Sequence, residues 1–253
     1  MAIAIRNSKE IALLKKAGEV VGQTLQFLTQ KIHAGMSLLE IDSLAEEHIY
    51  KMGATPAFKG LYGFPNTACI SVNEVVIHGI PTDYCLQEGD IVGLDLGAQI
   101  QGYFGDAAIT LAIGEPSAKD AKLIACAKES LYEAIASLEV GMHFKELSQI
   151  LENAIRGRGF VPLFDFCGHG IGKKPHEEPQ IPNYLTPGIK AKAGPKIKEG
   201  MVFCLEPMVC QKEGKPKILA DRWSVVSVDG LNTSHYEHTI AMVNKKAQIL
   251  TEV

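Results

Sequence analysis

The chain has 253 residues, a length that suits one large α/β domain or two small ones. Hydrophobic residues make up 46% of it and charged residues 21%, as in ordinary globular proteins. The formal net charge of -4 excludes an attraction of the whole protein to nucleic acid or to an anionic membrane. Because no apolar run approaches the ~18 residues of a membrane span and no signal-peptide pattern opens the sequence, we expect a cytoplasmic protein.

The predicted elements begin with two helices. Apolar residues that include Leu14, Val21 and Leu25 recur on one face and predict a helix from about Ser8 to Lys31. The segment GMSLLEIDSLAEEHIYKMG, which starts at Gly35, predicts a second and shorter amphipathic helix that a glycine ends.

Two apolar strands follow, and each contains one acidic residue. Asp95 lies within LQEGDIVGLDLGA, and Asp106 lies within FGDAAIT. A carboxylate inside an apolar strand is costly to bury unless it is paired or bound to a metal. Taken singly, either residue could also be an ordinary strand-end or turn residue.

The second half of the chain repeats this order of elements. A predicted helix over about Ala118–Leu138 precedes GMHFKELSQILENAIRGRG, which starts at Gly141 and resembles the segment at Gly35. Further on, IKEGMVFCLEPMV aligns with LQEGDIVGLDLGA, and HYEHTIA resembles FGDAAIT. We therefore expect a single domain over residues 1–253, with an internal repeat of about 8–113 and 118–245.

The repeat sets two further carboxylates in register with the first two, because Glu206 aligns with Asp95 and Glu237 with Asp106. A pseudo-symmetric fold would bring all four together near its axis, where they would repel one another without a cation. His169 follows the second short helix within GHGIG, where a histidine has little packing of its own. These five residues predict a site for two divalent ions, and their oxygen and imidazole donors favour Mn, Fe, Co or Zn.

One insertion breaks the repeat in the second half. The segment QKEGKPKILADRWSVVSVDG lies between Glu206 and Glu237 and predicts a β-hairpin. It contains Trp223, which is the only tryptophan of the chain. The remaining histidines are given no function: His33, His48, His143, His235 and His238. The six cysteines form no CxxC pair, so most are expected to be buried small apolar residues.

Several motifs resemble those of one enzyme family. They are NEVVIHGIP, GLDLGAQIQGYFGDAAIT, GHGIGKKPHEEPQIP, GMVFCLEPM and SHYEHTI. Together with the ordered ligand set, they are similar to the type I methionine aminopeptidases, in the short bacterial form without an N-terminal extension. The resemblance covers essentially the whole chain. It implies an α/β (α+β) "pita-bread" fold, a single catalytic domain in which two pseudo-symmetric halves place a central antiparallel sheet beneath outer helices.

The resemblance also implies roles for the ligands and two further histidines. Asp95 would bind one ion, Asp106 and Glu237 would bridge both, and His169 and Glu206 would complete the second. Two divalent ions of Co, Fe, Mn, Zn or Ni would activate a hydroxide that cleaves the first peptide bond. The enzyme would thereby remove the N-terminal methionine of nascent proteins when residue two is small.

Catalytic roles are implied for three residues: His78, His176 and Glu206. Glu206 would move the proton of the water, and the two histidines would contact the scissile amide and its carbonyl oxygen. The methionine side chain would lie among residues that the family places in its pocket: Phe58, Leu61, Phe64, Cys69, His78, His176 and Trp223. The chain departs from the commoner pattern at Phe58, Leu61 and Pro175, which concerns the shape of the pocket and not the reaction.

Two other functions compete with this interpretation. An Xaa-Pro aminopeptidase-like exopeptidase shares the fold, but such enzymes usually carry a sizeable N-terminal domain. A non-catalytic pita-bread binding protein would lack ligands, whereas all five are present here. We expect a monomer that acts on nascent polypeptide N-termini and does not bind membranes. The loop Lys190–Lys198 is either a solvated basic loop or a contact with ribosomal RNA.

Overall fold

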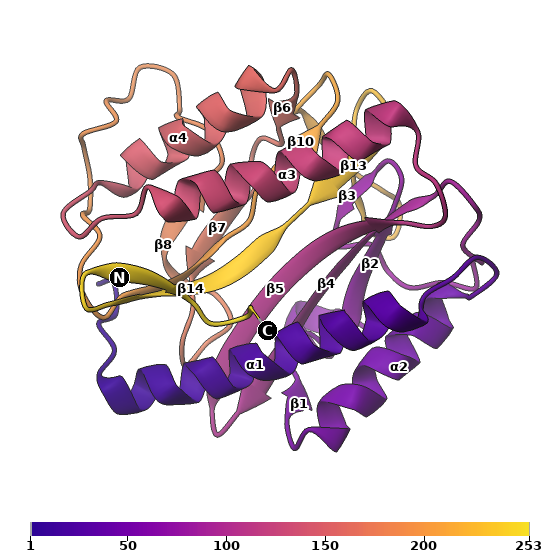
Figure 1. Ribbon diagram of the computed structural model, residues 1–253, viewed down its shortest axis with the longest axis horizontal. Helices are drawn as coiled ribbons and strands as arrows, with labels where there is room; N and C mark the ends of the chain where they lie inside the picture. Colours follow the sequence, from indigo (N-terminus) through magenta and orange to yellow (C-terminus); the bar gives the residue numbers. More distant parts are fainter. Residues whose placement is uncertain (1, 253) are drawn as a thin grey trace.

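A nine-stranded antiparallel sheet forms the centre of the protein, and four helices cover one of its faces (Figure 1). The computed structural model describes residues 2–252. The helices are α1 (Ser8–Lys31), α2 (Leu38–Lys51), α3 (Ala118–Ala136) and α4 (Phe144–Gly157). The sheet comprises β1 (Thr55–Pro56), β2 (Ala68–Val72), β4 (Ile91–Ile100), β5 (Tyr103–Ala112), β7 (Cys167–Gly170), β8 (Glu177–Pro182), β9 (Val202–Leu205), β14 (Glu237–Val243) and β15 (Lys246–Ile249).

The two halves of the chain meet in the middle of this sheet. Its order is β1-β4-β5-β14-β9-β7-β8, while β2 pairs with β4 and β15 with β14. Strands β4 and β5 come from the first half, and β9 and β14 come from the second. Figure 1 shows α1 and α2 across the first-half strands and α3 and α4 across the second-half strands. The predicted order of helix, helix and paired strands is therefore seen in each half.

The helix-facing side of the sheet holds the apolar core. Leu94 and Leu96 of β4 are fully buried in a cluster with residues of α1 and α2. In the second half, Phe203, Leu205 and Ile240 are fully buried with residues of α3 and α4. Because side chains alternate along a strand, the residues between these apolar positions lie on the opposite, uncovered face.

Helix α1 packs against β5 at the level of the backbone. A Cβ added at Gly105 would lie 2.6 Å from the backbone nitrogen of Gly18, so only glycine lets the helix come this close. The contact fixes which side of β5 faces the helix. Asp106, the next residue, therefore points away from it.

The insertion in the second half forms the predicted hairpin. Strand β11 (Pro216–Ile218) pairs with β12 (Val225–Ser227), and β12 pairs with β3 (Val75–Ile77) of the first half. A second three-stranded sheet joins β6 (Val161–Pro162), β10 (Met208–Cys210) and β13 (Thr233–His235). Because the hairpin crosses to the first half, Trp223 comes within 5.2 Å of Phe64, measured between ring centroids.

One predicted boundary is wrong by two residues. The helix expected to reach Leu138 ends at Ala136, because the Ser137 hydroxyl donates a 2.7 Å hydrogen bond to the carbonyl of Ala134. Such a side-chain bond competes with the continuing helix. None of the helices within residues 2–252 combines the length and apolarity needed to cross a bilayer.

Candidate active site

Strand register brings three of the four acidic residues together on the uncovered face. Ala108 of β5 pairs with Asp95 on one side and with Glu237 on the other. The side chains of Asp95, Ala108 and Glu237 therefore lie in a row across the sheet, with the small Ala108 side chain between the two carboxylates. Asp106 lies two residues along β5 from Ala108, on the same face. The small Ala108 side chain leaves space between the carboxylates.

Glu206 and His169 reach the same place from the second half. Glu206 follows β9 directly, next to the pairing of Leu205 with His238 of β14. His169 lies on β7 between two glycines. A Cβ at Gly168 or Gly170 would collide with a neighbouring backbone carbonyl, which explains why this strand is so rich in glycine.

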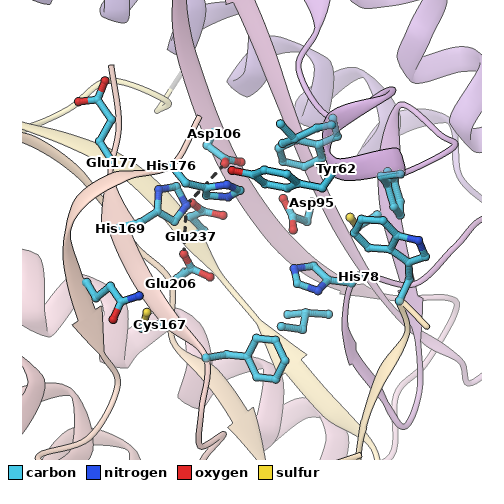
Figure 2. Close-up of a pocket in the computed structure, with 18 of the residues that line it drawn as sticks. Tyr62, His78, Asp95, Asp106, Cys167, His169, His176, Glu177, Glu206 and Glu237 are labelled. Atoms are coloured by element: carbon cyan, nitrogen blue, oxygen red, sulfur yellow. Dashed lines mark ion pairs between the residues drawn. The ribbon is translucent and has the colours of Figure 1, made fainter. Parts of the chain in front are cut away.

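The His169 ring is neutral, and its Nε2 carries a lone pair that can bind a metal ion. Its Nδ1 lies 3.1 Å from the carbonyl of Gly170, an acceptor that keeps the proton on Nδ1 and leaves Nε2 unprotonated. Burial lowers the pKa of His169 to about 3, so the ring carries no charge at neutral pH. Nevertheless Nε2 lies 3.4 Å from Glu206 Oε1 and 3.9 Å from Asp106 Oδ2 (Figure 2). Lone pairs that face one another in this way call for a cation between them.

The four carboxylates also lack a positive charge that would balance them. Burial raises the pKa of Asp95 to about 7. Burial raises the pKa values of Asp106, Glu206 and Glu237 well above the usual range, and repulsion from the neighbouring carboxylates adds to this. One oxygen each of Asp95, Asp106 and Glu237 is buried and accepts no hydrogen bond from the described residues. Unpartnered buried oxygens beside an unprotonated imidazole fit divalent metal ions.

Two residues at this centre were missed by the motif analysis. Cys204 and one ligand atom each of Asp106, His169 and Glu237 all lie within 4.8 Å of one another. Cys204 of β9 lies two residues before Glu206, which follows that strand directly, so alternation along the strand was the available signal. His235 was given no function, but its buried Nε2 lies 3.9 Å from Glu206 Oε2. No sequence signal distinguished it from the other histidines.

A cavity of about 490 Å³ opens directly onto the acidic cluster. Its wall contains every residue that the resemblance placed in the substrate pocket: Phe58, Leu61, Phe64, Cys69, His78, His176 and Trp223. The predicted metal ligands Asp95, Asp106, His169, Glu206 and Glu237 line the same cavity. Phe58, Phe64 and Cys69 form a buried apolar cluster that Leu61 and Trp223 complete. An apolar chamber therefore adjoins the carboxylates without a break.

His78 and His176 border the cavity between these two regions. His78 has a left-handed backbone, with φ of +57°, an uncommon conformation that costs energy and often marks a functional site. Burial lowers the pKa of His78 to about 4 and also lowers the pKa of His176. Both rings are therefore largely neutral at pH 7 and can exchange hydrogen bonds without adding charge.

The rim beside His176 is formed by Tyr62 and not by the residue that precedes the histidine. Pro175 is buried and is absent from the cavity wall, so this position supplies no aromatic ring there. Instead, Tyr62 is 74% exposed and stacks on the His176 ring at a centroid distance of 5.9 Å (Figure 2). Tyr62 also has a positive φ of 51°, which projects it from the turn η1 (Leu61–Gly63).

Comparison with known proteins agrees with this fold and cavity. Residues 12–244 match metallopeptidase family M24. A methionine aminopeptidase of Helicobacter pylori is 70% identical over 252 residues, which cover 100% of each chain. The crystal structure of methionine aminopeptidase from Thermotoga maritima is similar with a TM-score of 0.95, 37% identity and full coverage of both chains. Prolidase from Pyrococcus furiosus is similar with a TM-score of 0.80 and 25% identity, over 98% of this chain and 65% of that chain.

The chain therefore belongs to metallopeptidase family M24. Within this family, it is one of the type I methionine aminopeptidases. The predicted pita-bread fold, with two pseudo-symmetric halves around an antiparallel sheet and with outer helices, is confirmed.

The raised pKa of Asp95 leads to a prediction about the metal-free protein. Above the unfolded pKa of 3.8, the folded state holds the Asp95 proton more tightly than the unfolded state does. Asp95 therefore destabilises the fold increasingly as pH rises from about 4 to 7, and the effect levels off above that. We expect metal-free Asp95→Asn to melt several degrees above the metal-free wild type at pH 8, with the gap closing toward pH 4.

With saturating divalent metal, the order should reverse, because the variant has lost a ligand. Thermal melts at several pH values, with chelator and with metal, make the comparison. In the variant, Asp106, Glu206 and Glu237 also lose the repulsion of Asp95, which changes the gap in the same direction. A gap that does not change with pH would contradict the assigned role of Asp95.

Proposed function

We propose that the protein removes the N-terminal methionine from polypeptides whose second residue is small, with a two-metal centre held by Asp95, Asp106, His169, Glu206 and Glu237. One observation carries the proposal: the apolar chamber adjoins the acidic cluster in a single cavity. A methionine side chain in the chamber would place its own peptide bond beside the carboxylates. Methionine aminopeptidase activity itself follows from membership of the family.

The five ligands supply oxygen and imidazole donors that suit Mn, Fe, Co, Ni or Zn, and two such ions would supply Lewis-acid activation of water and of the scissile carbonyl. Glu206 would accept the proton of the attacking water and return it to the leaving amine. A neutral imidazole N–H of His176 would donate to the carbonyl oxygen as negative charge develops there. His78 would contact the scissile amide from the opposite rim.

Exopeptidase action follows from the same arrangement. The acidic cluster lines the cavity and would attract the free α-amino group of the substrate. An internal residue has no such amine, and its preceding chain would meet the sheet. His78 and His176 border the way out toward residue two, which favours small side chains there.

Two alternatives are less well supported. Prolidases share the fold, but this chain covers only 65% of the Pyrococcus furiosus protein, whereas it covers the Helicobacter pylori methionine aminopeptidase completely. A non-catalytic binding protein would not need the unpartnered buried oxygens of the cluster. We further propose that the chain acts as one catalytic domain, as a monomer, in the cytoplasm where nascent chains emerge.

The first test concerns the bridging ligands. Asp106→Ala and Glu237→Ala should each reduce cleavage of Met-Ala-Ser by at least ~10³-fold, because each removes a buried carboxylate that would hold the metal ions. Metal content after dialysis should fall in parallel. Glu47→Ala removes an exposed carboxylate of α2 outside the cavity and serves as the control. Near-normal turnover in either ligand variant would refute the two-metal centre as assigned.

The second test concerns residue two of the substrate. Met-Gly, Met-Ala and Met-Ser peptides should be cleaved efficiently, and Met-Lys, Met-Leu and Met-Phe peptides poorly. Values of kcat/KM over this series at one metal concentration give the result. Comparable values for Met-Ala and Met-Phe would show that the rim does not restrict residue two.

The loop Lys190–Lys198 supports a further proposal about partners. The segment forms neither helix nor strand, and Lys190, Lys192, Lys196 and Lys198 are all exposed. Hydrogen bonds to His143 and Phe144 hold it against the start of α4. Four exposed lysines on an anchored loop can bind phosphates even on a protein of net charge -4. We propose that this loop contacts ribosomal RNA near emerging nascent chains.

A lysine-to-alanine variant tests the loop. Alanine at all four loop lysines should weaken co-sedimentation with ribosomes and reduce its salt dependence, while cleavage of free peptides stays unchanged. The matched control carries alanine at four exposed lysines elsewhere: Lys16, Lys51, Lys119 and Lys122. If both variants bind ribosomes like the wild type, the loop is only a solvated surface.

A further inference from the structure

The segment before α1 carries a nearly buried arginine that reaches the rim of the cavity. The Arg6 side chain is only 9% exposed and forms ion pairs with Glu177 and, at 3.8 Å, with Glu10. Its backbone is fixed as well, because the Arg6 N–H donates a 2.7 Å hydrogen bond to the carbonyl of Gly200. An ion pair sheltered in this way is screened less by salt than a surface pair.

The partner of Arg6 holds the turn that leads to His176. Glu177 Oε1 accepts hydrogen bonds from the backbone N–H groups of Lys173, at 2.9 Å, and Lys174, at 3.2 Å. The other oxygen of the same carboxylate receives the Arg6 guanidinium. Gly172 opens this turn, and a Cβ there would collide with the Arg6 side chain. Arg6, Glu177 and the turn are therefore packed as one unit.

His176 depends on this unit for its position. Its ring packs edge-on against His169 at a centroid distance of 4.4 Å and stacks on Tyr62. Among residues 2–252, no side chain or backbone group forms a hydrogen bond with the ring. Figure 2 shows His176 directed toward the carboxylate cluster, whereas the adjacent Glu177 side chain points away from it. The backbone on either side of His176 therefore sets where the imidazole lies.

We propose that Arg6 is a positioning residue for His176, which acts through the Glu177 carboxylate and the turn that this carboxylate holds. The inference rests on the catalytic role proposed for His176. Without the guanidinium, Glu177 loses its buried counter-charge and turns toward water, which releases the two backbone N–H groups. The turn then loosens, and the imidazole no longer meets the carbonyl oxygen at the right distance.

A double-mutant cycle tests this coupling. Arg6→Ala should lower kcat for Met-Ala-Ser by about tenfold with less than about a twofold change in KM, since the geometry of the reacting groups is affected more than binding. In the His176→Ala background, the same change should cost less than about twofold, because the residue through which Arg6 acts is gone. Arg6→Lys should recover part of the activity, and Glu177→Gln should resemble Arg6→Ala.

Metal content and thermal melts are measured on every variant. Metal content should stay at the wild-type level, since neither Arg6 nor Glu177 belongs to the ligand set. Lys15→Ala, which breaks an exposed pair with Glu19 on α1, is the control and should leave kcat unchanged. If Arg6→Ala melts too low to assay, Arg6→Lys and Glu177→Gln complete the cycle with His176→Ala.

The outcomes separate this inference from the proposed function. Full activity of His176→Ala would refute the catalytic role of His176 and the inference with it. An impaired His176→Ala combined with an Arg6 effect that is equally large in both backgrounds would refute only the inference. A loss of metal from Arg6→Ala would also refute it, because the arginine would then support the ligands and not the histidine.

Discussion

Mutual repulsion among four buried carboxylates is the constraint on which the rest of this structure depends. Placing Asp95, Asp106, Glu206 and Glu237 on one face of a sheet is unfavourable for the protein alone, as their raised pKa values show. The opposite face compensates with apolar clusters that pack beneath the helices of each half. Bound cations would relieve the remaining repulsion. Part of the free energy needed to assemble the site would therefore come from cation binding.

This constraint explains the choice of residues around the cluster. Ala108 keeps space open between two strands that carry carboxylates. Thr239 exchanges hydrogen bonds with the backbone of Asp106, its hydroxyl donating to the carbonyl at 2.7 Å, and so holds that part of β5 in place. Gly105 lets α1 press against β5 from behind. The sheet is therefore held rigidly at the point where four like charges would otherwise spread it apart.

The five residues that line the acidic end of the cavity could be picked out from the sequence because each lies in a motif that occurs twice or stands out locally. A carboxylate inside an apolar strand is conspicuous, and the internal repeat showed which carboxylates correspond. Residues that act through distant contacts gave no such signal. Arg6 and Glu177 are far apart in sequence, His235 looks like any other histidine, and Tyr62 differs from a surface tyrosine only through its backbone conformation. The end of α3 was misjudged because a single serine hydroxyl decides it.

The hairpin of the second half pairs with β3 of the first half, and the cavity has two kinds of wall as a result. One wall carries the acidic cluster, and the other is apolar. The proposed metal ligands lie on or directly beside paired strands, where register fixes them. Much of the apolar wall comes from the turn η1 and from the end of the hairpin that carries Trp223, whereas Cys69 of the same wall lies on β2 opposite Asp95. Substitutions in these loops would change which substrate side chains fit the chamber, while the acidic cluster stays the same. An inhibitor that gains its affinity from the loops therefore depends on side chains that can change without altering the acidic cluster, whereas one that relies on the strands contacts the cluster itself.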